Sequence, residues 1–352
     1  MSAALPDGPL LDLPADYRTP DAFENGLFTA THRLAETGLF TEENVLRMLE
    51  THPRELANVS RMGHDPTVLE WSEGLTDGLS PEDVLAALNK GRLWLNIRKV
   101  LDHQPEAAAA INRLYDDLEA ACPGFTATRR SANVLVSSPG AMVYYHIDVP
   151  QNILWHVSGE KRVWAYPQRL ADTPRDELEA IVAVKKEEDA GYDPAWDADA
   201  FAVDLKPGEW ITWPQHTPHR VQNTVGLNIS VSTEHYSPRA FKYVRAHRAN
   251  RMLRDRFGLP LTSTKTSGLG YRAKAAAYLA GRAVQEYVTK KRDLYHYPKT
   301  FRVDPTAPHA TVELNGGPTP AAFLPRTAPA PPTERPAEPE PEPAREPELA
   351  LA

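Results

Sequence analysis

Before about residue 124, apolar residues recur at the spacing of amphipathic helices. Thr41 and Ser80 are each placed as N-cap residues ahead of such a run, and Ser80 is followed by a proline and early acids. The Ala-rich stretch 105–121 also has helical spacing and ends next to a Pro-Gly pair. The sequence therefore predicts a mainly helical N-terminal region over residues 1–124.

From residue 125 the pattern changes to alternation with a period of two, which is typical of strands. The segments that we expect to be strands are 132–137, 141–146, 152–166, 201–205, 210–213 and 221–233. The charged stretch 172–199 interrupts them and is interpreted as an insertion. Several short strands separated by Pro-Gly turns indicate a β-barrel or sandwich over residues 125–237.

Helical spacing returns after Pro238, with a first helix ending at Gly258 and a second running from about 271 to 294. We assign residues 238–302 to basic C-terminal helices and 303–352 to a tail rich in Pro and Glu. The tail has too few apolar residues to offset the entropy of ordering it, so we expect 325–352 to be disordered.

The composition indicates a soluble protein of a reducing compartment. Of 352 residues, 41% are apolar, which is enough for a core, and Cys122 is the one cysteine, so one chain cannot form a disulfide. The first 21 residues do not have the pattern of a secretory signal, and no apolar run has the length of a membrane helix. We therefore expect a cytoplasmic protein without membrane association.

The net charge of −8 conceals a strongly basic segment. Residues 239–302 contain 16 Lys or Arg against three Asp or Glu. Such a segment can bind nucleic acid, bind an acidic partner, or dock on the acidic body of its own chain. Because no nucleic-acid motif is recognised, the third explanation is favoured and nucleic acid is not expected as a partner.

The segment around His146 contains the candidate metal ligands. In a strand, His146 and Asp148 would point to the same face, and His219, which lies 71 residues after Asp148, can supply a third ligand. Two histidines and one carboxylate leave open positions on a metal, as in non-haem Fe(II) oxygenases. The alternative is an accidental surface pair, which is the usual explanation of a lone His-x-Asp.

The spacing of a second motif supports the metal site. Gly208, Pro214, His219 and Asn223 follow a cupin-type pattern in which His216 replaces the usual glycine. Residues 132–236 thus resemble the cupin superfamily and, because the first motif is His-x-Asp, its JmjC-type branch of Fe(II)- and 2-oxoglutarate-dependent oxygenases. This resemblance implies an α+β fold with a double-stranded β-helix (cupin or jelly-roll) core.

The resemblance also implies a co-substrate site. The series His146, Asp148, Asn152 and Lys161 is similar to that of a protein asparaginyl hydroxylase of the same branch. By that similarity Lys161 would pair with the distal carboxylate of 2-oxoglutarate, and Asn152 would donate to the co-substrate near the metal. The hydroxyl that the family often places three residues before the first histidine is replaced by valine, so a second anchor is expected from Ser232 or Tyr145.

Other residues in the region have simpler explanations. Lys161 could be a solvated lysine after a Gly turn, and Asn152 could belong to a turn or a strand edge. We expect His156 to be a hydrogen-bonded neighbour of the site and His216 to lie on its rim. Four aromatic residues are expected in the core: Trp155, Trp164, Trp210 and Trp213.

The leading hypothesis is an Fe(II)- and 2-oxoglutarate-dependent oxygenase that uses O2 to hydroxylate a protein side chain or a small molecule. The alternative is a metal-binding cupin that senses a ligand and signals through the basic helices without turnover. The resemblance further implies a homodimer formed through the C-terminal helices.

Overall fold

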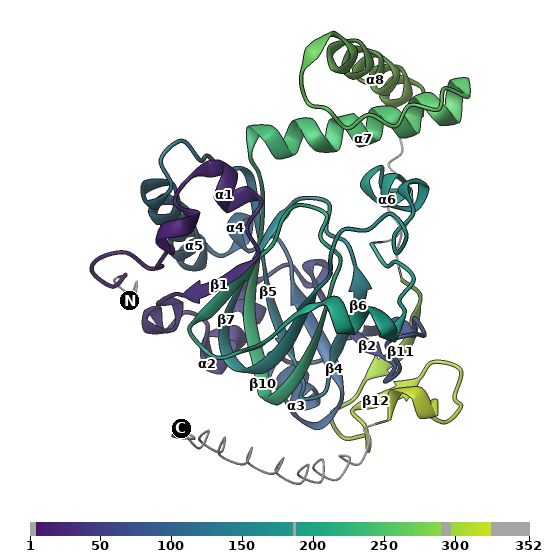
Figure 1. The fold of residues 1–352 in the computed structure, drawn as a ribbon. Coiled ribbons are helices and arrows are strands. Elements are labelled where there is room, and N and C mark those ends of the chain that lie inside the picture. Colours follow the sequence, from purple (N-terminus) through teal and green to yellow (C-terminus); the bar gives the residue numbers. More distant parts are fainter. Residues whose placement is uncertain (1–4, 186–187, 290–296, 325–352) are drawn as a thin grey trace, which may run out of the picture.

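The computed structural model describes residues 5–185, 188–289 and 297–324. Twelve strands form one continuous sheet that curls over itself, and helices cover its outside (Figure 1). The helices are α1 Pro20–Glu24, α2 Glu42–Thr51, α3 Pro81–Lys90, α4 Val100–His103, α5 Pro105–Ala121, α6 Arg175–Val182, α7 Pro238–Phe257 and α8 Gly268–Thr289.

The strands are β1 Phe28–Thr31, β2 Ala57–Met62, β3 Trp71–Leu75, β4 Leu93–Ile97, β5 Thr128–Ser137, β6 Met142–His146, β7 Gln151–Ala165, β8 Phe201–Leu205, β9 Glu209–Thr212, β10 His219–Tyr236, β11 Lys299–Val303 and β12 Thr311–Glu313. Their order in the sheet is β1-β9-β7-β10-β5-β4-β2-β3-β11-β12, with β6 paired to β10 and β8 paired to β7.

Two long antiparallel strands, β7 and β10, form the centre of the jelly roll. The first half of β7 pairs with β9 and its second half with β8, while β10 pairs with β6 at its start and with β5 at its end. The strands bend where Gly159 has a φ of +77°, and a Cβ there would lie 2.6 Å from the Asn228 side chain. Only glycine fits this close approach, so the bend depends on it.

The sheet separates two apolar clusters. On its outer face, side chains such as Val134 and Trp155 pack against residues of the N-terminal helices, including Ile111 and Leu114. A smaller cluster that includes Leu154 and Trp213 comes from residues on the inner face. The alternation of residues predicted for the strands therefore corresponds to two buried faces of the sheet. The inner face carries polar as well as apolar residues.

The expected fold class, α+β with a jelly-roll core, is confirmed, and so are the predicted helix starts. Thr41 and Ser80 accept the N-cap hydrogen bonds of α2 and α3, and Ser80 forms a full capping box with Asp83. The mainly helical description of residues 1–124 is incomplete, because the short strands β1 to β4 lie there as well as the helices. These strands are only four to six residues long, so their local pattern was weak.

Strands also lie at the end of the segment assigned to basic helices, residues 238–302, and at the start of the predicted tail. Strand β11 runs parallel to β3, and β12 pairs with β11. Glu313 of β12 forms a buried ion pair with Arg61 of β2, whose guanidinium group lies 4.4 Å from the centre of the Phe301 ring. The predicted disorder of residues 325–352 falls outside the described residues.

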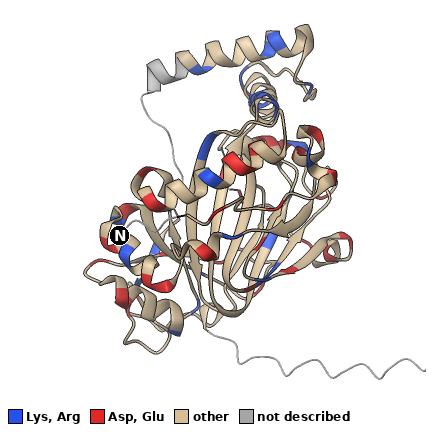
Figure 2. Cartoon of the chain, turned by 90° about the vertical axis from the view of Figure 1, so that its left-hand side faces the viewer, with Lys and Arg blue, Asp and Glu red and all other residues tan. Residues whose placement is uncertain are grey.

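The basic helices dock largely on acidic groups of the same chain. Three arginines of α7 contact α6. Figure 2 shows the basic residues of the chain in blue and the acidic ones in red. Arg248 donates to the Val182 carbonyl oxygen, Arg251 pairs with Asp176, and Arg254 pairs with the buried Glu179. This agrees with the explanation favoured from the sequence. In the described part of the chain, no helix combines the length and apolar character needed to cross a bilayer.

Candidate metal centre

Two neighbouring strands and the turn after one of them position the three candidate ligands. His146 ends β6 and His219 begins β10, and these two residues pair directly across the sheet. Asp148 follows two residues after His146, before β7 begins. Because paired residues point to the same face, both imidazoles and the carboxylate converge inside the jelly roll.

The distances fit one metal ion. His146 Nε2 lies 3.7 Å from Asp148 Oδ1, and His219 Nε2 lies 3.5 Å from Asp148 Oδ2. Among the described residues, this is the one group of three potential ligands whose atoms all lie within 4.8 Å of one another. The His146 side chain is 17% exposed and that of His219 only 4%, so the site opens on the side of His146.

Hydrogen bonds around the ligands fix which atoms face the metal. The Nδ1 atom of His146 lies 2.7 Å from the Tyr144 carbonyl oxygen, and that of His219 lies 3.1 Å from the Thr217 carbonyl oxygen. A carbonyl oxygen only accepts, so Nδ1 carries the proton and Nε2 keeps a lone pair for a metal. Asn152 Nδ2 donates to Asp148 Oδ2 at 2.9 Å and orients the carboxylate.

The electrostatics of the three ligands also favour a cation. Burial raises the pKa of Asp148. Burial, followed by the charge of His146, holds the pKa of His219 well below its usual range, so its imidazole is neutral. When deprotonated, a buried carboxylate beside two imidazole Nε2 atoms offers one negative charge and three lone pairs, which is the donor set that a divalent metal needs.

Lys161 lies deeper on the same inner face. Lys161 pairs across the sheet with Asn223, which follows His219 by four residues. The backbone of Asn223 therefore lies about 13 Å along β10 from that of His219. This separation is close to the combined length of a lysine side chain and a five-carbon diacid. The residue is 3% exposed, and burial lowers the pKa of its ammonium group to about 7. No acidic side chain of the described residues pairs with it, so its burial is uncompensated and suits an anionic ligand.

The two polar residues predicted beside the metal lie there. Asn152 Nδ2 donates to the Ser232 hydroxyl oxygen at 3.1 Å as well as to Asp148, so all three side chains form one connected group. Tyr145 does not join them, and its expected role as an anchor is wrong. Its hydroxyl lies 3.4 Å from the Thr173 hydroxyl, and its ring packs against Tyr166 on the other side of β6.

The remaining residues are placed as follows. His156 is hydrogen-bonded, as expected, to the Ser230 hydroxyl at 3.0 Å and to the Gly159 carbonyl oxygen at 2.9 Å. His216 is not a rim residue, because it is buried and stacks on Tyr243 of α7. Trp155, Trp210 and Trp213 lie in the core. Trp164 is half-buried beneath the Arg220 guanidinium group, 3.4 Å from its ring.

Glu234 is a site neighbour that the sequence interpretation missed. It pairs with Asn152 across the sheet and accepts a hydrogen bond from the Ser131 hydroxyl at 3.1 Å. Burial, and then the charge of Asp148, raise the pKa of Glu234 to about 7. The signal was present, because the polar alternation Asn228, Ser230, Ser232 continues to Glu234.

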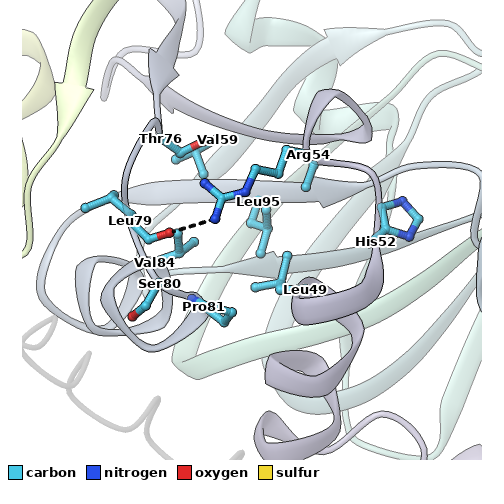
Figure 3. A pocket seen from close by; sticks show the side chains of 11 residues that line it. Leu49, His52, Arg54, Val59, Thr76, Leu79, Ser80, Pro81, Val84 and Leu95 are labelled. Carbon is cyan, nitrogen blue, oxygen red and sulfur yellow. Dashed lines mark hydrogen bonds between the residues drawn. The ribbon is translucent and has the colours of Figure 1, made fainter.

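A cavity on the far side of the sheet is separate from this centre. It lies between α2, α3 and β4, and has a volume of about 50 Å³. Figure 3 shows apolar side chains such as Leu49 and Leu95 around it, with Arg54 donating to the Leu79 carbonyl oxygen at its edge. None of the predicted site residues lines this cavity.

Residues 86–239 match the family described as the cupin-like domain. This match supports the resemblance to JmjC-type cupins drawn from the sequence. The match includes all three candidate ligands and Lys161.

This chain is similar to solved structures at low identity. Two structures of the Escherichia coli ribosomal oxygenase YcfD are 13% and 14% identical, cover 78% of this chain and 70% and 68% of that chain, and have TM-scores of 0.44 and 0.42. A third structure, of YcfD with cobalt and 2-oxoglutarate, is 15% identical, covers 66% of this chain and 56% of that chain, and has a TM-score of 0.35. No curated protein matches the sequence.

Proposed function

We propose that the protein is an Fe(II)- and 2-oxoglutarate-dependent oxygenase. The observation that supports this most is the combination of one carboxylate and two imidazoles on a common centre with a buried, unpaired ammonium group on the same inner face. Three protein ligands leave the other positions of a metal for a chelating acid and O2. A purely structural metal site would be closed by a fourth protein ligand.

Each residue has a distinct task in this proposal. His146, Asp148 and His219 hold the metal, and Asn152 keeps the carboxylate oriented. Lys161 binds the distal carboxylate of 2-oxoglutarate, and Asn152 and Ser232 line the space between that lysine and the metal. When bound, Fe(II) and 2-oxoglutarate supply the oxidising chemistry, while the protein supplies orientation and exclusion of water.

The substrate we propose is a protein side chain or a small molecule. The second candidate function is a metal-binding cupin that senses a ligand without turnover. One observation favours it: α7 packs against His216, three residues before the ligand His219, so the basic helices contact the loop that positions the metal centre. The oxygenase is expected to consume 2-oxoglutarate, whereas the sensor is expected to bind metal without consuming it. Measuring 2-oxoglutarate consumption therefore distinguishes the two candidate functions.

Asp148→Ala tests the assignment. Removing the carboxylate deletes one metal ligand and the acceptor of Asn152, so succinate formation from 2-oxoglutarate is expected to fall by at least about a hundredfold. Circular dichroism checks that the fold is retained, and Asp77→Ala, an exposed aspartate in a turn, is the control. Turnover by a folded Asp148→Ala variant at the level of the control would refute the proposed function.

A further inference from the structure

Glu234, which is half-buried, differs from the two fully buried glutamates of the described residues. Glu179 pairs with Arg254, and Glu313 pairs with Arg61. Glu234 has no basic partner among the described residues, and its one hydrogen bond comes from the Ser131 hydroxyl. A carboxylate removed from water without a cation costs stability, so such a group indicates a ligand that compensates it.

The position of Glu234 relates it to the metal centre. It pairs directly with Asn152, whose side chain donates to the metal ligand Asp148. It also follows Ser232 by two residues, so both side chains lie on the inner face of β10. The charge of Asp148, after burial, contributes to the raised pKa of Glu234.

The carboxyl group remains within reach of a ligand. Glu234 is only partly buried as a residue, whereas its strand neighbours Thr233 and His235 face the core and are fully buried. Ser131 occupies one of its oxygens, Oε2, which leaves the lone pairs of Oε1 for a second donor. A bound metal would compensate the negative charge of Asp148, but the carboxylate of Glu234 would still have no cationic partner.

We propose that Glu234 binds a cationic group of the primary substrate, an ammonium or guanidinium, beside the metal centre. This inference rests on the proposed oxygenase function and narrows its substrate to a basic side chain or amine. The cation would replace the water lost by the carboxylate with a charge-assisted hydrogen bond. The same contact would fix which carbon of the substrate faces the metal, so Glu234 is a specificity-determining residue.

The test compares charged probes with neutral probes of similar shape. N-acetyl-arginine methylamide is compared with its citrulline counterpart, and N-acetyl-lysine methylamide with its norleucine counterpart, in the anaerobic Fe(II) and 2-oxoglutarate complex. Free arginine is a further arm, which separates a small-molecule substrate from a peptide side chain. Dissociation constants are measured by calorimetry for the wild type, Glu234→Gln and the control Glu106→Gln, which removes an exposed acid.

The wild type and the Glu106→Gln control are expected to bind at least one cationic probe about tenfold or more tightly than its neutral counterpart. In Glu234→Gln this ratio should fall to about one. A missing preference in the wild type, or a preference that survives in Glu234→Gln, would overturn the inference.

The proposed oxygenase function is tested by a separate measurement on the same samples. The metal-to-ligand charge-transfer band of the Fe(II) and 2-oxoglutarate complex reports the oxygenase centre without any substrate. If the band forms and the cation preference is absent, only the role of Glu234 is wrong. If the band is absent, the oxygenase is refuted, and calorimetry on the Zn(II)-loaded protein still decides whether Glu234 binds cations.

Discussion

At the residue scale, the site depends on two buried groups of opposite charge, neither of which forms an ion pair with a Lys, Arg, Asp or Glu side chain among the described residues. Asp148 lies beside His146 and His219, and Lys161 pairs across the sheet with Asn223, whose backbone lies about 13 Å along β10 from that of His219. A metal chelated by a dicarboxylic acid would compensate both groups. This complementarity is a stronger argument than either residue by itself, because solvated lysines and accidental His-x-Asp pairs are common.

The pKa of Lys161, lowered by burial to about 7, predicts how pH affects binding of 2-oxoglutarate. The acid binds the protonated form, so its affinity should fall about tenfold per pH unit above pH 7.5, until the raised pKa of the complex is reached. The Lys161→Met variant should bind 2-oxoglutarate weakly at every pH. Lys161→Arg keeps its charge and should bind with little pH dependence, as calorimetry between pH 7 and 9 would show. The same slope in Lys161→Arg as in the wild type would contradict the assignment.

At the element scale, one buried ion pair links the C-terminal strands β11 and β12 to the rest of the sheet, in addition to the pairing of β11 with β3. Arg61 of β2 meets Glu313 of β12, and the Thr300 hydroxyl accepts a hydrogen bond from Arg61 at 3.0 Å. Since the guanidinium group is itself buried, removing the acid would leave an uncompensated charge.

Glu313→Ala is therefore expected to lower the free energy of unfolding by about 3–5 kcal/mol in urea denaturation. Glu36→Ala breaks an exposed pair with Arg33 and serves as the control, with little expected change. A loss for Glu313→Ala no larger than that of the control would show that the pair does not stabilise this edge.

Elements with a strong local pattern could be predicted from the sequence. The helix expected over 105–121 is α5 with the same bounds, and the strands β5 to β10 lie where alternation placed them. The short strands β1 to β4, β11 and β12 could not, because three to six residues carry too little alternation, and β11 also depends on the distant strand β3. Likewise His216 and Tyr145 were misplaced, since packing against α7 and the insertion decides where they point.

At the scale of the whole molecule, the C-terminal helices lie beyond the end of the jelly roll (Figure 1). They carry exposed apolar side chains: Phe257 is 66% exposed, Leu269 83% and Leu279 47%. Large exposed apolar side chains on one pair of helices are typical of an interface. We propose, as the sequence resemblance implies, that these helices pair two copies of the chain.

The dimer proposal predicts twice the chain mass in light scattering at micromolar concentration. Leu269→Glu combined with Leu279→Glu should shift the protein to a monomer, because it would bury charges in the interface. Val68→Glu changes a similarly exposed residue away from these helices and should have no effect. A wild-type protein that is monomeric at this concentration would dismiss the proposal.

The central claim is that His146, Asp148, His219 and Lys161 together hold Fe(II) and 2-oxoglutarate. Anaerobic addition of Fe(II) and 2-oxoglutarate to the purified protein, followed by visible absorption, tests it most directly. A metal-to-ligand charge-transfer band is expected in the wild type, and it should be lost in Asp148→Ala and weakened in Lys161→Met at the same concentrations. A wild-type protein that binds Fe(II) but gives no band with 2-oxoglutarate would contradict the account.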